Sequence, residues 1–153
     1  MRRDSLFKHS SGATESTFML KTGITSPITC LTMLPNKICI GSHDGIFFYD
    51  RSSGKETHVL RGIDIYRIFE SSQKELWIGT RMYGLYRINK KGEIRQVPFS
   101  PGSPTGISSW QIRDFVEDGE RNIWFGTFDG LHKYSTKTGQ YSLIQIPKYV
   151  GGL

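Results

Sequence analysis

The sequence has few residues of the kinds that build catalytic or metal sites. Among its 153 residues there are only two cysteines and four histidines, and the histidines are dispersed. No histidine lies at ligand spacing from a cysteine, so no metal site is expected. There is no Gly-x-Ser-x-Gly elbow, no phosphate-binding loop and no His-Glu-x-x-His motif. We therefore expect neither an enzyme nor a cofactor.

Long apolar runs and helical patterns are also missing. No apolar run reaches the length of a transmembrane helix, and residues 4–17 are too polar for the core of a signal peptide. No stretch combines helical periodicity with cap signals. We expect an all-β segment that does not itself contact a membrane. If the parent protein is exported, its signal peptide and membrane span lie outside this chain.

Positive charge is present but not concentrated. The net charge is +6, and the lysines are spread along the chain, mostly in or near expected turns. Lysines at such positions solvate turns and protect sheet edges. A nucleic-acid surface clusters its charge, so no nucleic-acid partner is expected.

Three copies of one short pattern recur along the chain. Each copy has an apolar run, a Gly-Ser or Gly-Thr pair, a short turn, a glycine and a second apolar run. The copies span residues 38–46, 76–85 and 123–131. Self-similarity at a period of about 40 residues is typical of solenoids, propellers and arrays.

The repeat extends on both sides of these copies. Two apolar residues, three positions apart, begin each unit, and the first lies 13 or 14 residues before the glycine of the Gly-Ser or Gly-Thr pair. A polar turn with glycine and a last short strand follow each copy. Each unit therefore holds four short strands joined by turns, as a β-propeller blade does. The apolar pairs are Ile28 and Leu31, Ile65 and Ile68, and Ile112 and Phe115.

This organisation predicts an all-β fold, a β-propeller fragment of about three and a half four-stranded antiparallel blades. The expected blades cover residues 28–62, 63–104 and 105–147, with an outer half-blade and connection over 1–27 and a tail over 148–153. A closed propeller needs about 4 to 8 blades, so we expect a fragment of a longer propeller. The alternative is a small array that caps its open faces by self-association.

Two tryptophans and one of the two cysteines occupy one strand position of the repeat. Trp77 and Trp124 are equivalent and flanked by apolar residues, which predicts packing between blades. Cys39 takes this position in the first unit, and Cys30 lies on the neighbouring strand. The diagonal between them is about 7–8 Å in a regular sheet, too far for easy bridging. We expect two buried free thiols.

The second and third copies, residues 76–85 and 123–131, resemble the two-component regulator propeller repeat, and residues 112–119 resemble the strand pair that opens such a repeat. The first unit departs from the family pattern, since Cys39 replaces the Trp and Ser42 the Thr. The resemblance implies the periplasmic, extracytoplasmic sensor of a membrane-anchored hybrid two-component histidine kinase. Many such sensors detect glycan fragments. The kinase chemistry itself is not encoded in this chain.

The loop tips vary while the frame around them repeats. Loops on a rigid scaffold commonly carry function, so the tips are candidates for ligand binding. Aromatic tips could stack on sugar rings, and polar tips could bond hydroxyl groups. The alternative is that the tips vary because nothing constrains them. The candidate residues are His43, Arg81, Tyr83, Trp110, Gln111, Phe128 and Asp129.

Two hypotheses about function follow. In the first, the chain is part of a non-catalytic sensor propeller whose partners are an oligosaccharide ligand and either the remaining blades or a second copy. In the second, it is a stand-alone or truncated propeller that serves as a scaffold for protein–protein contacts. The sequence names neither the ligand nor the number of blades.

Overall fold

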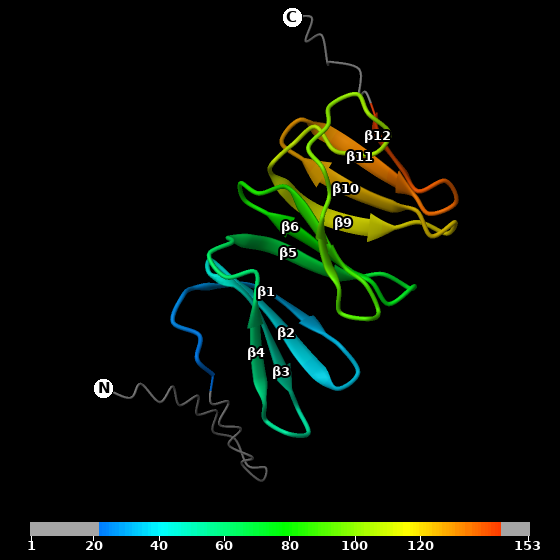
Figure 1. The fold of residues 1–153 in the computed structure, drawn as a ribbon. Coiled ribbons are helices and arrows are strands. Elements are labelled where there is room, and N and C mark those ends of the chain that lie inside the picture. The colour runs from blue at the N-terminus through cyan, green and yellow to red at the C-terminus, as the bar shows by residue number, and fades with distance from the viewer. Residues whose placement is uncertain (1–21, 145–153) are drawn as a thin grey trace, which may run out of the picture.

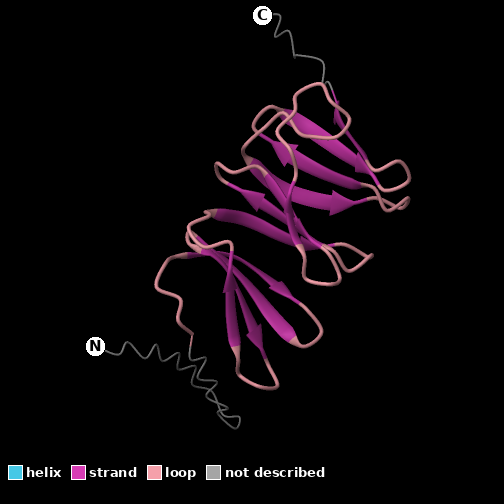
Figure 2. Ribbon diagram, viewed as in Figure 1, coloured by secondary structure: helices cyan, strands magenta, loops and turns pink. Residues whose placement is uncertain are grey.

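The computed structural model describes residues 22–144, which form twelve β-strands. No helix occurs in this range, and so none that could cross a membrane. The strands make three four-stranded antiparallel sheets (Figures 1 and 2). The expected all-β fold is confirmed. The half-blade expected over residues 1–27 lies almost wholly outside the described residues, and the tail over 148–153 lies entirely outside them.

Within each sheet the strands follow the order of the chain. The first sheet consists of β1 (Ile28–Met33), β2 (Lys37–Ser42), β3 (Gly45–Asp50) and β4 (Glu56–Val59). The second consists of β5 (Ile65–Glu70), β6 (Leu76–Thr80), β7 (Leu85–Ile88) and β8 (Ile94–Gln96). The third consists of β9 (Ile112–Glu117), β10 (Ile123–Thr127), β11 (Gly130–Ser135) and β12 (Gln140–Ile144).

The sheets follow one another like the blades of a propeller. The first strand of each sheet contacts the first strand of the next, β1 with β5 and β5 with β9. Figure 1 shows the three sheets in succession, with these first strands side by side. Two apolar cores fill the spaces between successive sheets. The fold therefore rests on contacts between sheet faces rather than on one central core.

The three-residue step between the paired apolar residues is explained by a β-bulge. In a regular strand, residues three apart point to opposite faces, yet Ile65 and Ile68 are both buried in the core between the first two sheets. The pairing of β5 with β6 shifts after Ile65, which leaves Tyr66 as an extra residue. Shifts at the same place in the other two units make Thr29 and Arg113 the corresponding residues. The bulge returns the second apolar residue to the face of the first.

The glycine of each Gly-Ser or Gly-Thr pair lies where the next sheet comes closest. A Cβ at Gly79 would lie 2.6 Å from the carbonyl oxygen of Ile112, and one at Gly41 would lie 2.9 Å from Cγ2 of Ile65. Both distances are shorter than side chains tolerate. A Cβ at Gly126, in the third sheet, would meet nothing within 4 Å. The first two glycines thus permit close packing of sheets, whereas the third faces open space.

Trp77 packs between the second and third sheets, as expected. It is 1% exposed, and its ring centroid lies 5.0 Å from that of Tyr134. The guanidinium of Arg87 lies over both rings, at 4.4 Å from the centroid of Trp77 and 4.5 Å from that of Tyr134. An ion pair of 2.6 Å with Glu75 fixes the Arg87 head group. These contacts join two sheets through one cation.

Trp124 does not pack between two sheets within the described residues, so this expectation is not met there. Its strand neighbours Ile123 and Phe125 belong to the core shared with the second sheet, so Trp124 points to the opposite face. It pairs there with Val116, which is 60% exposed, and lies beneath the ammonium group of Lys133. No fourth sheet covers this face among residues 22–144.

The cysteine prediction is confirmed. Cys30 and Cys39 are both buried and free, and Cys39 pairs with Thr32 across the first hairpin. Burial raises the pKa of the Cys39 thiol to about 12, and the nearby Cys30 adds to the shift. Both side chains therefore act as small apolar groups in the core between the first and second sheets.

Candidate functional site

A hydroxyl group closes the loop after the second strand of every sheet. The Oγ1 of Thr80 donates a 2.7 Å hydrogen bond to the carbonyl of Gly84 and accepts one of 2.9 Å from the N–H of Tyr83. Ser42 and Thr127 make the corresponding pairs of bonds in the other two loops. The Ser or Thr of the repeat is thus explained by the backbone bonds of a tight turn.

A second repeated bond ties each loop tip to its own sheet. The N–H of the residue after the Ser or Thr donates to the carbonyl of the residue just before the first strand. The three pairs are His43 with Pro27 at 3.2 Å, Arg81 with Asp64 at 2.9 Å and Phe128 with Gln111 at 3.3 Å. The loop tips and the segments leading into the first strands therefore share one edge of the sheets.

We call this edge the rim. It carries all seven residues that the sequence put forward and four that it did not. The rim comprises His43, Asp64, Tyr66, Arg81, Tyr83, Phe99, Trp110, Gln111, Arg113, Phe128 and Asp129.

Asp64 joins the first two sheets at the rim. Its Oδ1 lies 2.7 Å from Nδ1 of His43 in the first sheet, and its Oδ2 lies 2.9 Å from Nε of Arg81 in the second. The carboxylate is partly buried, while His43 and Arg81 are each more than 40% exposed. One acidic group thus orders two side chains that remain open to solvent.

Tyr66 and Arg113, the extra residues of two bulges, join the second and third sheets. The ring of Tyr66 lies 4.9 Å from the guanidinium carbon of Arg81 and 5.2 Å from that of Arg113. Both distances suit cation–π attraction. A long hydrogen bond of 3.4 Å connects Arg113 to Oε1 of Gln111. Contacts therefore run without interruption from His43 to Gln111 across all three sheets.

An exposed aromatic group lies beside this polar network. Trp110 stacks on Phe99 with ring centroids 4.3 Å apart and planes 10° apart, and both rings are partly open to solvent. The carbonyl of Trp110 accepts a 2.8 Å bond from the N–H of Gly84, which places the pair next to the tip that carries Tyr83. Phe128, at 74% exposed, projects from the third tip, and Asp129 beside it is also exposed.

Sequence reasoning missed Asp64, Tyr66, Phe99 and Arg113. A signal for two of them was present, because a three-residue step between buried residues requires a bulge, and a bulge re-aims the extra side chain. Asp64 occupies the position just before the first strand, where Gln111 was already a candidate. Phe99 belongs to a long connection without a repeated counterpart, and no pattern pointed to it.

Two polar groups away from the rim have packing roles. Asp118 holds a turn by accepting hydrogen bonds from the side chains of Trp124 and Asn122 and from two backbone N–H groups. The bond from Trp124 and those from Asn122 lower the pKa of Asp118 to about 2. His132 is 1% exposed and lies 2.9 Å from Oγ of Ser108. Within residues 22–144 no group of three His, Cys, Asp or Glu residues could hold a metal ion.

Comparisons with known proteins agree with the propeller interpretation. No protein-family model and no curated protein matches this sequence. Among solved structures, the extracellular domain of the hybrid two-component system BT4673 from B. thetaiotaomicron superposes with a TM-score of 0.66 at 24% identity, covering 80% of this chain. That of BT3049 from the same organism gives 0.57 at 22% identity over 68% of this chain. The WD40 propeller domain of Doa1 gives 0.58 at 15% identity over 84%.

This chain spans only a small part of those structures. It covers 17% of the BT4673 domain, 14% of the BT3049 domain and 40% of the Doa1 domain. At these identities the likeness shows the fold. The resemblance to sensor propellers is therefore confirmed at the level of the fold, which is that of a β-propeller fragment.

Proposed function

We propose that this chain is a ligand-sensing segment of a longer β-propeller, in the extracytoplasmic sensor of a membrane-anchored hybrid two-component histidine kinase. The observation that carries the proposal is the rim, where variable tip and bulge residues from three sheets form one connected, solvent-open surface. The fold shared with the extracellular domains of BT4673 and BT3049 supports an extracytoplasmic location. The ligand class we propose is an oligosaccharide derived from a glycan.

The rim offers the two kinds of contact that a sugar needs. Arg81 and Arg113 present guanidinium donors in a fixed plane, which suits hydroxyl or acidic oxygens. Arg113 forms no ion pair with a carboxylate among the described residues. The Trp110–Phe99 stack and Tyr83 supply exposed aromatic surface, against which the apolar face of a sugar ring can pack.

The same contacts suggest how ligand binding at the rim would change the arrangement of the sheets. The His43–Asp64 pair crosses from the first sheet to the second, and the Tyr66–Arg113 contact crosses from the second to the third. A ligand that binds Arg81 and Arg113 together would favour one spacing of the sheets over another. A ligand shifts such an equilibrium by its difference in affinity for the two arrangements. The resulting change in sheet spacing would alter the activity of the parent kinase.

The experiment is a melt of the purified chain across a panel of oligosaccharides, with light scattering on each sample. We expect a saturable rise in melting temperature for one glycan class. Replacing Arg113 with Ala should remove that rise while lowering the stability of the free protein by no more than about 1 kcal/mol, the scale of an exposed cation–π contact. Arg95→Ala is the matched control, since Arg95 is a strongly exposed arginine on β8 whose contact with Glu93 is 3.7 Å. An equal loss in both variants, or no shift for any glycan, would contradict the assignment.

A second function is supported by a different observation. The third sheet has an apolar surface that no sheet within residues 22–144 covers. It is formed by Val116, Trp124 and Leu131. Such a surface marks protein–protein contact. If the chain acts as a scaffold, a partner protein would bind this face, and the oligosaccharide panel would leave the melt unchanged. The equivalent face of the second sheet is covered by the third, so a further blade of the same propeller would compete with a partner protein for this face.

A further inference from the structure

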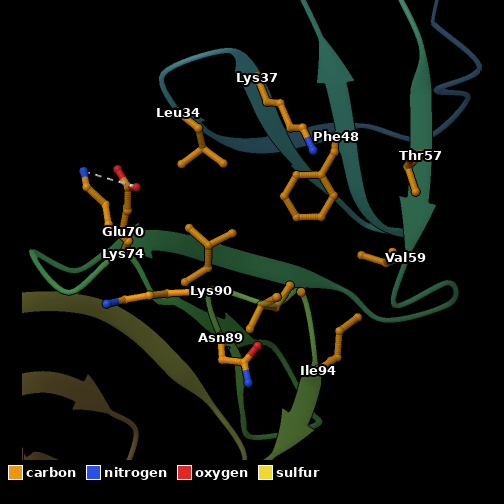
Figure 3. Close-up of a pocket in the computed structure, with 13 residues that line it drawn as sticks. Leu34, Lys37, Phe48, Thr57, Val59, Glu70, Lys74, Asn89, Lys90 and Ile94 are labelled. Carbon is orange, nitrogen blue, oxygen red and sulfur yellow. Dashed lines mark ion pairs between the residues drawn. The ribbon is translucent and has the colours of Figure 1, made fainter.

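A cavity of about 360 Å³ lies between the first and second sheets, at the end of the strands opposite the rim. It lies near the β1–β2, β5–β6 and β7–β8 turns. Figure 3 shows its apolar side chains, among them Leu34, Phe48 and Ile94, directed into the space between the two sheets. None of the lining residues belongs to the rim. The apolar lining residues are Leu34, Phe48, Val59, Leu76, Ile88 and Ile94.

The apolar character of the cavity wall reflects a difference between the repeats. Between the second and third sheets, Trp77 and its cross-strand partner Arg87 pack against Tyr134. In the first sheet the same two positions hold Cys39 and its partner Phe48. Cysteine is far smaller than tryptophan, and phenylalanine has no charged head group. The space between the first two sheets therefore has a more apolar wall, and no indole ring crosses it.

The border of the cavity is positively charged. Lys37 extends from the first sheet, and Lys74 and Lys90 extend from turns of the second (Figure 3). All three are exposed. The lining holds one carboxylate, that of Glu70, which lies 3.5 Å from the ammonium nitrogen of Lys74. Glu70 therefore pairs with Lys74, and the ammonium groups of Lys37 and Lys90 are the two in the lining that do not pair with it.

An apolar floor with two ammonium groups at its edge fits one class of ligand. Pockets that bind small molecules measure about 300–1,000 Å³ and combine apolar walls with a few polar groups that fix orientation. We propose that this cavity binds a small amphiphilic carboxylate, with its aliphatic or aromatic body between Phe48 and Ile94 and its carboxylate at the ammonium group of Lys37, which lies beside Phe48 (Figure 3). The site is independent of the rim and of the function proposed for it.

The test compares two probes that differ only in charge. Octanoate and octanamide share the same alkyl chain and differ in the charge of the head group. The difference in their affinities, measured by calorimetric titration of the full-length protein, therefore reports the contribution of the lysine. We expect octanoate to bind roughly fivefold more tightly, the scale of an exposed ion pair. The variant Lys37→Gln should abolish this preference and leave octanamide binding unchanged.

Two further variants separate the site from general effects of charge and packing. Lys137→Gln removes an exposed lysine from a turn of the third sheet and should leave the preference intact. Val59→Trp fills the cavity and should weaken both probes, with a melt to check folding. Equal affinity for the two probes, no binding of either, or the same loss with Lys137→Gln would overturn the proposal. Glycan binding at the rim is measured separately, so either proposal can fail alone.

Discussion

Gly79 lies against Ile112 so closely that a single methyl group at Gly79 would come within 2.6 Å of the Ile112 carbonyl oxygen. The obstacle is backbone, which cannot rotate away. We predict that Gly79→Ala destabilises the fold by about 1–3 kcal/mol, the usual cost of overpacking. Denaturant unfolding of the variant measures this directly.

Gly126 provides the matched control, because it occupies the same position in the third sheet and a Cβ there meets nothing within 4 Å. Gly126→Ala should change stability by less than about 0.5 kcal/mol. Equal destabilisation by the two substitutions would mean that strand conformation, and not the approach of the next sheet, explains the glycine.

The Arg87 contacts should contribute measurably to the union of the second and third sheets. Arg87 is about three-quarters buried, pairs with Glu75 at 2.6 Å and lies over two aromatic rings. Arg87→Ala leaves the Glu75 carboxylate without this partner, so we predict a loss of about 2 kcal/mol. Arg95→Ala, at an exposed arginine, should cost less than about 0.5 kcal/mol. Similar melts for the two variants would show that the stacked guanidinium adds nothing.

The open face of the third sheet should make the isolated chain associate. Val116 is 60% exposed beside Trp124. Exposed apolar faces of this kind favour association with another protein surface. We predict that Val116→Glu lowers the apparent mass seen by light scattering and leaves the melting temperature within a few degrees. Thr138→Glu, in an exposed turn, adds the same charge and should not change association. A monomeric unsubstituted chain would contradict the prediction.

His132 should make stability depend on pH. Burial lowers its pKa, and the negative charge of Asp129 offsets only part of that shift. The native ring therefore stays neutral where the unfolded chain, with an ordinary pKa of about 6.5, takes up a proton. We predict that the contribution is complete above about pH 6.5 and is lost as the pH falls below it. An NMR titration of the ring giving a pKa above the ordinary value would refute this.

The sequence predicted the strands well because their signals are local. Each unit carries its own turn glycines and apolar runs, and the Gly-Ser or Gly-Thr pair marks the same loop in all three sheets. Trp77 was correctly placed between sheets, since an apolar strand of a blade packs on both faces. Trp124, with the same sequence environment, lies on an open face, because burial there depends on a neighbouring sheet and not on the strand itself.

Four of the eleven rim residues were not predicted, for a related reason. His43 and Arg81 were found because they follow a repeated pair of residues. Their shared partner Asp64 lies 21 positions from His43, and only the packing of one sheet on the next brings the two together. Tyr66 and Arg113 were missed because the apolar step was noted without the bulge that it requires. Contacts between units are set by geometry that no single repeat contains.

The hydroxyl and backbone bonds that close each tip involve no atom of the tip side chains. Ser42, Thr80 and Thr127 hold their loops whether the next residue is His43, Arg81 or Phe128. Exchanging the side chains of the tips between units would therefore leave these closing bonds in place. A scaffold of this kind separates the residues that hold the loops from those that are free to diversify, so the surface chemistry of the rim can change by single substitutions.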